Sequence, residues 1–313
     1  MFPAELRLIS DGEMVMSRVL ITGVDGFTGR YLTTALAAQG HEVVGISHSA
    51  ITVPIEGLAS SHICDLTNAK ALKDVLLAVQ PDKVAHLAAI AFVSHGVVED
   101  IYRTNIVGSR NLLEAVSAVG SADAVLLASS ANIYGNRVSG AIDETVAPDP
   151  INDYAVSKLA MEFVARLYQE RVPIIIARPF NYTGVGQATN FVIPKIVDHV
   201  RRGATMIELG NLDVARDFSD VRDVVLAYAA LLNDPDAIGQ VFNICSGKAE
   251  TLRDVIATIQ DISGHHFDVT VNPAFVRQNE VKMLWGDRSK SQNMIGLRPK
   301  HDLRDTLAWM LEG

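Results

Sequence analysis

The fold is decided by the stretch Arg18-Val19-Leu20-Ile21-Thr22-Gly23-Val24-Asp25-Gly26-Phe27-Thr28-Gly29. A short β-branched run leads into the first glycine, and residues 27–39 then show the apolar spacing of a helix that Gly40 ends. The first glycine permits a tight turn, the second lets backbone N–H groups approach a pyrophosphate, and the third lets helix and strand pack closely. The order of strand, turn and helix predicts a diphosphate-binding turn with Phe27 and Thr28 beside the ligand; an ordinary glycine-rich turn is the alternative.

Apolar runs alternate with helical periodicity through the first half of the chain. The expected strands lie at 42–47, 62–66, 83–89, 123–129 and 172–178. The expected helices lie at 68–79, 101–119 and 154–171. Continuous apolar strands between helices predict a parallel sheet covered on both faces, the doubly wound α/β fold, in which ligands bind at the carboxyl ends of the strands.

The alternation loosens after residue 178. Helices are expected at 191–202, 221–232, 252–263 and 303–311, and strands at 206–209 and 240–244. We expect a dinucleotide-binding domain over 17–180 and a smaller C-terminal α/β substrate-binding domain over 181–313, some segments of which return to the first domain. Residues 1–16 lack the basic start and apolar core of a secretion signal and are expected to form an extension outside the fold.

Composition narrows the function classes. The net charge of -9 argues against a nucleic-acid partner, because binding to the phosphate backbone needs clustered cations. No apolar run reaches the roughly 18 residues of a membrane span, so no membrane partner is expected. Cys64 and Cys245 are far apart, so neither a disulfide framework nor a metal site is expected, and a reducing cytoplasm fits.

The second expected strand ends in Ser47-His48-Ser49, where an acid usually holds the adenosine ribose 2′-hydroxyl. Without a carboxylate the site has no reason to repel a 2′-phosphate, and His48 could help to receive one, although no arginine stands beside it in the sequence. NADP(H) and NAD(H) are therefore both expected as cofactors. Asp65 would accept a hydrogen bond from the adenine amino group or act as the N-cap of a helix beginning at Thr67.

A phenol and an ammonium stand four residues apart in Tyr154-Ala155-Val156-Ser157-Lys158. The cation would lower the tyrosine pKa from its reference value of about 10 and let the phenol exchange a proton, and the lysine can also bond a nicotinamide ribose. A solvated helix face is the alternative for the pair alone. Ser130, at the end of the preceding strand, would orient the substrate oxygen, and the three residues together predict hydride transfer with Tyr154 as the proton-exchanging group.

Four motifs occur together: Gly23-xx-Gly26-Phe27-x-Gly29, His86-Leu87-Ala88-Ala89, Ser129-Ser130-Ala131-Asn132-Ile133-Tyr134-Gly135 and Tyr154-xxx-Lys158. They resemble the extended short-chain dehydrogenases, the NAD-dependent epimerase/dehydratase family, which modify nucleotide-sugars. The resemblance implies a Rossmann fold. It also implies cofactor contacts by Ser47, His48, Asp65, Leu66, Leu87, Ala88, Ala89, Asn105 and Phe180.

Three later motifs narrow the resemblance: Arg178-Pro179-Phe180-Asn181-Tyr182-Thr183-Gly184, Phe191-Val192-Ile193-Pro194-Lys195 and Gly210-Asn211-Leu212-Asp213-Val214-Ala215-Arg216-Asp217-Phe218-Ser219-Asp220-Val221-Arg222-Asp223-Val224. They resemble the branch of GDP-mannose 4,6-dehydratases and GDP-6-deoxy-4-keto-mannose reductases. The implied GDP-sugar contacts are Asn181, Val192, Lys195, Arg216, Arg277 and Glu280. Arginines suit forked contacts with a diphosphate, surface ion pairing being the alternative, which we expect for Arg222 and Arg288.

Dehydratases of this branch need an acid after the catalytic hydroxyl, where this chain has Ala131 and Asn132. Neither side chain can protonate a leaving hydroxyl, so elimination is disfavoured and hydride transfer is kept. We therefore expect reduction of the 4-keto group of a GDP-4-keto-6-deoxy-hexose, giving GDP-rhamnose or its C4 epimer. A nucleotide-sugar 4-epimerase is the main alternative, a 4,6-dehydratase is a weaker one, and a non-catalytic dinucleotide-binding protein is remote.

Two expected helices, at 104–119 and 154–171, have apolar faces that could pair across a two-fold axis. The family resemblance implies a homodimer. The alternative is that both faces pack only on their own sheet.

Overall fold

The computed structural model describes residues 16–91, 97–136, 140–276, 281–296 and 298–313, which fall into two compact units. The first unit comprises Met1–Ile133, Asn152–Arg178 and Val225–Phe242. The second comprises Tyr134–Ile151, Pro179–Val224 and Asn243–Gly313. The units are thus interleaved along the chain: residues 134–151, expected in the first domain, group with the second unit, and 225–242 return to the first.

A seven-stranded sheet is the centre of the described fold, with strand order β11-β6-β5-β4-β1-β2-β3. Its strands are β1 (Arg18–Thr22), β2 (Glu42–Ser47), β3 (Leu58–Ile63), β4 (Lys83–His86), β5 (Ala124–Ala128), β6 (Ile174–Pro179) and β11 (Val241–Ile244). Every register from β3 across to β6 is parallel. The chain proceeds from β1 to β2 on one side and returns to β4 on the other, so the point where the strand order reverses lies between β1 and β4.

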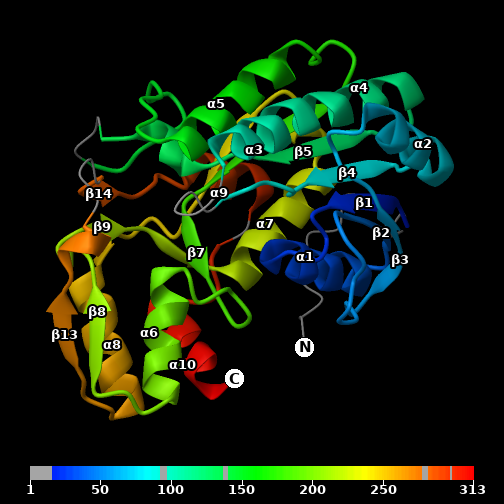
Figure 1. The fold of residues 1–313 in the computed structure, drawn as a ribbon. Helices are drawn as coiled ribbons and strands as arrows, with labels where there is room; N and C mark the ends of the chain where they lie inside the picture. The colour runs from blue at the N-terminus through cyan, green and yellow to red at the C-terminus, as the bar shows by residue number, and fades with distance from the viewer. Residues whose placement is uncertain (1–15, 92–96, 137–139, 277–280, 297) are drawn as a thin grey trace. The chain divides into compact units, whose positions relative to one another are not determined.

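Helices cover both faces of this sheet (Figure 1), as expected for a doubly wound fold. They are α1 (Phe27–Ala38), α2 (Ala69–Val79), α3 (Val98–Tyr102), the π-helix η1 (Arg103–Gly108), α4 (Ser109–Val119), α5 (Asp153–Arg166) and α7 (Val221–Asn233). Leu72, Leu112 and Met161 bring α2, α4 and α5 into one buried cluster with Leu20 and Val125 of the sheet. This packing of apolar helix stripes on apolar strands confirms the predicted fold class.

One strand prediction was wrong in position. A strand was expected at 62–66, whereas β3 spans Leu58–Ile63. This strand is at the edge of the sheet and mostly exposed, with Ser60, Ser61 and His62 in it. An edge strand can be polar because only one side of it pairs, so a search for apolar runs places it too late.

The second unit has its own apolar core. Its main elements are α6 (Val192–Arg201), β8 (Met206–Leu209), α8 (Leu252–Ser263), β13 (Asp268–Val271) and α10 (Leu303–Glu312). Ile196, Ile207, Val255 and Leu307 join these elements in a single buried cluster. The expected helices and the strand at 206–209 are therefore present.

Among the described residues of this unit, six short strands and one α-helix were not predicted from the sequence. They are β7 (Asn181–Thr183), β9 (Ala215–Arg216), β10 (Phe218–Asp220), β12 (Glu250–Thr251), β13, β14 (Met283–Leu284) and α9 (Ser289–Ile295). Most contain only two to four residues, too few for periodicity to be visible. Among the described residues, no helix has the length and apolar character needed to cross a membrane.

Candidate active site

The glycine turn leaves no room for side chains. Gly23 has φ +70°, and a Cβ there would lie 2.8 Å from the Ala88 Cα. A Cβ on Gly29 would lie 2.3 Å from the carbonyl oxygen of Gly23, and one on Gly26 would lie 3.2 Å from the same oxygen. The absence of side chains at these glycines lets β1, α1 and the segment after β4 approach one another closely. A diphosphate-binding turn requires this arrangement.

The start of α1 also suits an anion. Gly26 is the N-cap residue and has no capping side chain, and the first turn contains no acidic residue. The partial positive charge of the helix N-terminus is therefore not neutralised by the helix itself. The turn fits the diphosphate of a dinucleotide, with Phe27 and Thr28 in the first helical turn as expected.

The end of β2 has no carboxylate. Ser47 is buried and donates from Oγ to the Ser49 carbonyl at 2.7 Å, while His48 is exposed. No arginine lies beside His48 in the sequence, but in the structure Arg30 of α1 contacts the loop that follows β2. Its Nε donates to the Asp25 carbonyl at 3.1 Å, and its Nη1 reaches the Val53 carbonyl at 3.4 Å. The guanidinium of Arg30, which the sequence analysis did not identify, thus contacts the loop that follows β2.

Asp65 is exposed after β3, and its Oδ1 accepts from the Thr67 backbone N–H at 2.8 Å. This bond is the main cause of the lowered pKa of the Asp65 carboxyl. The alternative in which Asp65 caps a helix beginning at Thr67 is wrong: α2 begins at Ala69, and Asn68 is its N-cap. A contact of Asp65 with adenine stays a prediction.

The end of β4 is held by a buried histidine. His86 Nδ1 lies 2.7 Å from Thr22 Oγ1, and its Nε2 lies 2.8 Å from Ser109 Oγ. Burial lowers the pKa of His86 to about 3, so the ring is neutral. Thr22 Oγ1 also accepts from the Ala88 N–H at 3.3 Å, which ties the predicted cofactor segment containing Leu87 and Ala88 to β1.

Asn105 connects this segment to α5. Its Oδ1 accepts from the Ile90 N–H at 2.9 Å, and its Nδ2 donates to the Ile90 carbonyl and to Ser157 Oγ. Ser157 donates in turn to the Tyr154 carbonyl at 2.7 Å. Asn105 is 1% exposed, so it acts by orienting the chain after Ala89 rather than by offering an open side chain.

Tyr154 and Lys158 lie on one face of α5. The Lys158 Nζ is 5.9 Å from the centre of the Tyr154 ring and donates to the Ala128 carbonyl at 2.7 Å. Lys158 is 3% exposed, which excludes the solvated-face alternative for this residue. Burial lowers its pKa to about 8. A buried cation beside the phenol favours the phenolate and so suits Tyr154 to exchange a proton.

Ser130 follows β5 and is also buried. Its Oγ accepts from the Asn132 N–H at 3.1 Å, at the start of the 3-10 helix η2 (Ala131–Tyr134). The two positions after Ser130 hold no acid: they are Ala131, which is 1% exposed, and Asn132, which is half-buried. Leu66, predicted beside the cofactor, is buried too, and a Cβ on Gly108 would lie 3.0 Å from it.

The second unit contains the residues that the family resemblance implies as GDP-sugar contacts. Asn181 is exposed on β7, and Val192 is 36% exposed at the start of α6. Lys195 donates from Nζ to the Glu208 carbonyl at 2.8 Å and lies 4.5 Å from the centre of the Phe275 ring. Arg277 and Glu280 lie outside the described residues.

Three further residues of this unit have defined partners. Arg216 of β9 donates from Nη1 to the Ala215 carbonyl at 2.9 Å. Phe180, predicted as a cofactor contact, is buried and stacks on Tyr134 with ring centres 6.2 Å apart, so its side chain is engaged within the unit. Arg222 pairs with Asp220 at 2.7 Å, so the expected ion pair is present, but the Asp220 side chain is buried and the pair is not a surface one.

Arg288 was expected to form a surface ion pair. Its Nη1 donates instead to the Ser246 carbonyl at 2.8 Å. The Gly247 backbone lies beside this guanidinium. Among the described residues, Arg288 thus bonds a loop of the second unit and has no acidic partner.

A parallel sheet with a glycine turn at its reversal point, together with a partly buried tyrosine and a buried lysine one helical turn apart, defines a nucleotide-dependent oxidoreductase of the short-chain dehydrogenase class. Residues 20–310 match the family model described as GDP-mannose 4,6 dehydratase, and the chain belongs to this family. The predictions of family and enzyme class are confirmed.

Three proteins illustrate the likeness. The GDP-6-deoxy-D-mannose reductase of Pseudomonas aeruginosa is 34% identical over 94% of this chain and 96% of its own length. The structure of RMD from Pseudomonas aeruginosa complexed with NADPH is 31% identical, covers 95% of this chain and 98% of its own, and has a TM-score of 0.82. A crystal structure from Burkholderia cenocepacia, described as that of an epimerase candidate, is 49% identical over 95% and 97% of the two chains, with a TM-score of 0.89.

Proposed function

We propose that this protein reduces the 4-keto group of a GDP-4-keto-6-deoxy-hexose with NADPH or NADH. One observation favours reduction over elimination: Ser130, Tyr154 and Lys158 are present, while Ala131 and Asn132 stand where the acid that elimination requires would be. The similarity to a GDP-6-deoxy-D-mannose reductase and to a structure complexed with NADPH supports the same activity.

Three residues of the chain would have separate roles in this reduction. The bound cofactor supplies a hydride to C4 of the sugar. Tyr154 donates its phenolic proton to the developing O4 alkoxide, so the carbonyl becomes a hydroxyl, and the phenolate regains a proton from solvent. Lys158, buried and cationic, stabilises that phenolate, and the Ser130 hydroxyl orients O4.

The cofactor would be held by backbone and by small side chains. Gly23, Gly26 and Gly29 fit its diphosphate, which the N-terminus of α1 attracts. Ser47, His48 and Arg30 are the groups near the end of β2 that would meet the adenosine ribose or its 2′-phosphate.

The GDP moiety is assigned to residues of the second unit. Lys195 of α6 and Arg216 of β9 supply cations, and Asn181 of β7 and Val192 of α6 are exposed. Arg277 and Glu280 stay predictions. A guanidinium can contact two oxygens of a diphosphate at once, which is the role proposed for Arg216.

A 4-epimerase is the second candidate, favoured by the likeness to the Burkholderia cenocepacia structure. It would use Tyr154 as well but must oxidise and then reduce its substrate on tightly held NAD. A purified protein that retains cofactor and acts without added reductant would indicate the epimerase.

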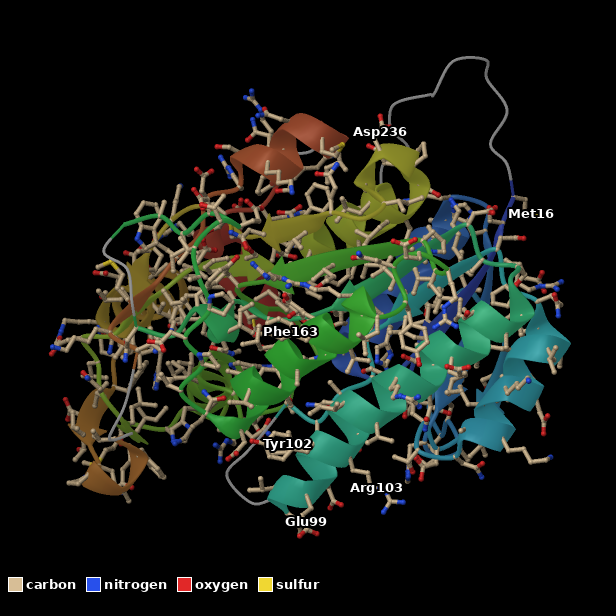
Figure 2. The ribbon with its side chains drawn as sticks, turned by 90° about the horizontal axis from the view of Figure 1, so that it is seen from above. Met16, Glu99, Tyr102, Arg103, Phe163 and Asp236 are labelled. Carbon is tan, nitrogen blue, oxygen red and sulfur yellow. The ribbon has the colours of Figure 1, made fainter. Side chains whose placement is uncertain are left out.

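The enzyme is further proposed to act as a homodimer through α4 and α5. Apolar side chains are exposed on and beside these helices: Val107 is 45%, Phe163 53% and Leu167 72% exposed. Figure 2 shows α5 beside the run from α3 to α4, with Phe163 and Tyr102 labelled, and the Tyr102 hydroxyl donates to Asp153 at 2.7 Å. Light scattering of the Phe163→Glu/Leu167→Glu variant should give half the mass of the unaltered protein.

The decisive experiment offers the protein GDP-4-keto-6-deoxy-mannose with NADPH or NADH and identifies the product. Formation of GDP-rhamnose or its C4 epimer is expected. Absence of turnover with both cofactors would overturn the reductase proposal, and the C4 configuration is read from the product.

A further inference from the structure

A buried ion pair lies directly behind the Ser130–Tyr154–Lys158 site, within the first unit. Glu162 follows Lys158 by one turn of α5, and Arg178 is in β6. Arg178 donates from Nε to Glu162 Oε1 at 2.9 Å and from Nη2 to Oε2 at 2.7 Å. The two side chains are 6% and 2% exposed, so this forked pair is shielded from water.

The same carboxylate bonds the end of β5. Ser129, the residue before Ser130, donates from Oγ to Glu162 Oε1 at 2.5 Å. One helical turn earlier, Lys158 donates to the carbonyl of Ala128. Two successive turns of α5 therefore bond two successive residues of the chain that leads into the Ser130 hydroxyl.

We propose that Glu162, oriented by Arg178, is a positioning residue for both Ser130 and Lys158. Through Ser129 it fixes the backbone that presents the Ser130 hydroxyl, and its negative charge helps to keep the neighbouring Lys158 ammonium protonated. This inference rests on the proposed hydride-transfer function of the site.

The charges around Lys158 explain why a carboxylate is needed there. From α5 it faces Tyr154 and Glu162, from β4 it faces the neutral His86, and from β6 Arg178 is bound to Glu162. Burial lowers the pKa of Lys158, and the Glu162 charge opposes that shift. Removing the Glu162 charge would therefore take away a carboxylate that favours the protonated form of the buried Lys158.

A purely stabilising role explains the buried Glu162–Arg178 pair less well than a positioning role does. Removing two charges from water costs free energy that their attraction only partly offsets, so apolar residues of similar size are often as stable at such positions. The bonds from this pair to the residue beside Ser130 are instead what a positioning role requires.

Three variants test the proposal. Glu162→Gln removes the charge but keeps the shape, Ser129→Ala removes only the bond to the β5 end, and Glu162→Met/Arg178→Met removes both charges together. Asp74→Asn is the matched control, because it removes a carboxylate from the exposed Lys70–Asp74 pair of α2. For each protein we would measure kcat, KM, the thermal midpoint, and the NADPH dissociation constant by cofactor fluorescence from pH 6 to 10.

Ser129→Ala is expected to lower kcat about tenfold at nearly unchanged KM. Glu162→Gln is expected to move the alkaline decline of NADPH affinity and of kcat to lower pH by about one unit, since Lys158 loses its proton earlier. The double variant is expected to fold and to lose activity about as strongly as Ser129→Ala, whereas the control stays within twofold.

Unchanged kcat in Ser129→Ala together with an unchanged pH profile in Glu162→Gln would overturn the inference, even if the double variant does not fold. The NADPH measurement needs no sugar. If the unaltered protein binds NADPH but reduces no keto sugar, the proposed function fails, while the shifted pH profile still decides the role of Glu162 toward Lys158.

Discussion

Burial differs between two groups of residues. One group lies at the proposed catalytic site of the first unit, and the other comprises the predicted GDP-binding residues of the second unit. Lys158, Glu162 and Arg178 are buried, and each bonds a named group of a neighbouring element. Asn181 is exposed, and Val192 is more than a third exposed. The difference indicates that the groups proposed for the chemical step are held in place by bonds within the protein, whereas these two residues proposed to contact the nucleotide lie at the surface of their unit.

The largest effect should come from the catalytic end. Tyr154→Phe removes the proton donor and leaves the ring, so kcat should fall by about 10³-fold with little change in the NADPH dissociation constant. Steady-state kinetics and cofactor fluorescence measure the two quantities. A Tyr154→Phe enzyme with near-normal kcat would mean that another group protonates the sugar.

The second unit should respond in binding rather than in rate. Arg216→Ala removes a charge-assisted contact worth roughly 1.5–3 kcal/mol, so KM for the GDP-sugar should rise about 10- to 100-fold while kcat changes little. Arg253→Ala, which breaks an exposed pair with Asp213, is the control and should leave KM unchanged. Equal effects of both variants on KM would remove the proposed GDP contact.

The pH dependence should follow the buried lysine. Its pKa is lowered to about 8, so the ammonium is present below that pH and lost as pH rises through it. We expect kcat/KM of the unaltered enzyme to decline by about tenfold per pH unit above this value. A profile that stays flat to pH 10 would contradict the assignment of Lys158 as the cation beside Tyr154.

The smallest expected effect concerns cofactor choice. Arg30 contacts the loop after β2, where a 2′-phosphate would lie, so Arg30→Ala should raise the NADPH dissociation constant about fivefold and leave that of NADH nearly unchanged. Lys70→Ala, which changes an exposed lysine of α2, is the control. Equal weakening of both cofactors would show that Arg30 supports only the loop.

Residues close together in the chain were predicted well. The glycine turn, the Tyr154–Lys158 pair and most helices depend on spacings of a few residues, which a sequence displays directly. The role of Asp65 at a helix start was wrong, because Asn68, three residues later, makes the capping bond. Arg30 was missed because its partner, the Val53 carbonyl, is 23 residues away.

The sequence by itself determined the parallel-sheet fold, the glycine turn and the spacing of Tyr154 and Lys158, because periodicity, glycine position and helical spacing are local properties of the chain. Only the tertiary structure showed that Lys158 is buried and that Glu162 joins Arg178 to Ser129. These features depend on side chains 16 and 33 residues apart meeting where all of them are buried, so that burial and pairing set both charge and orientation.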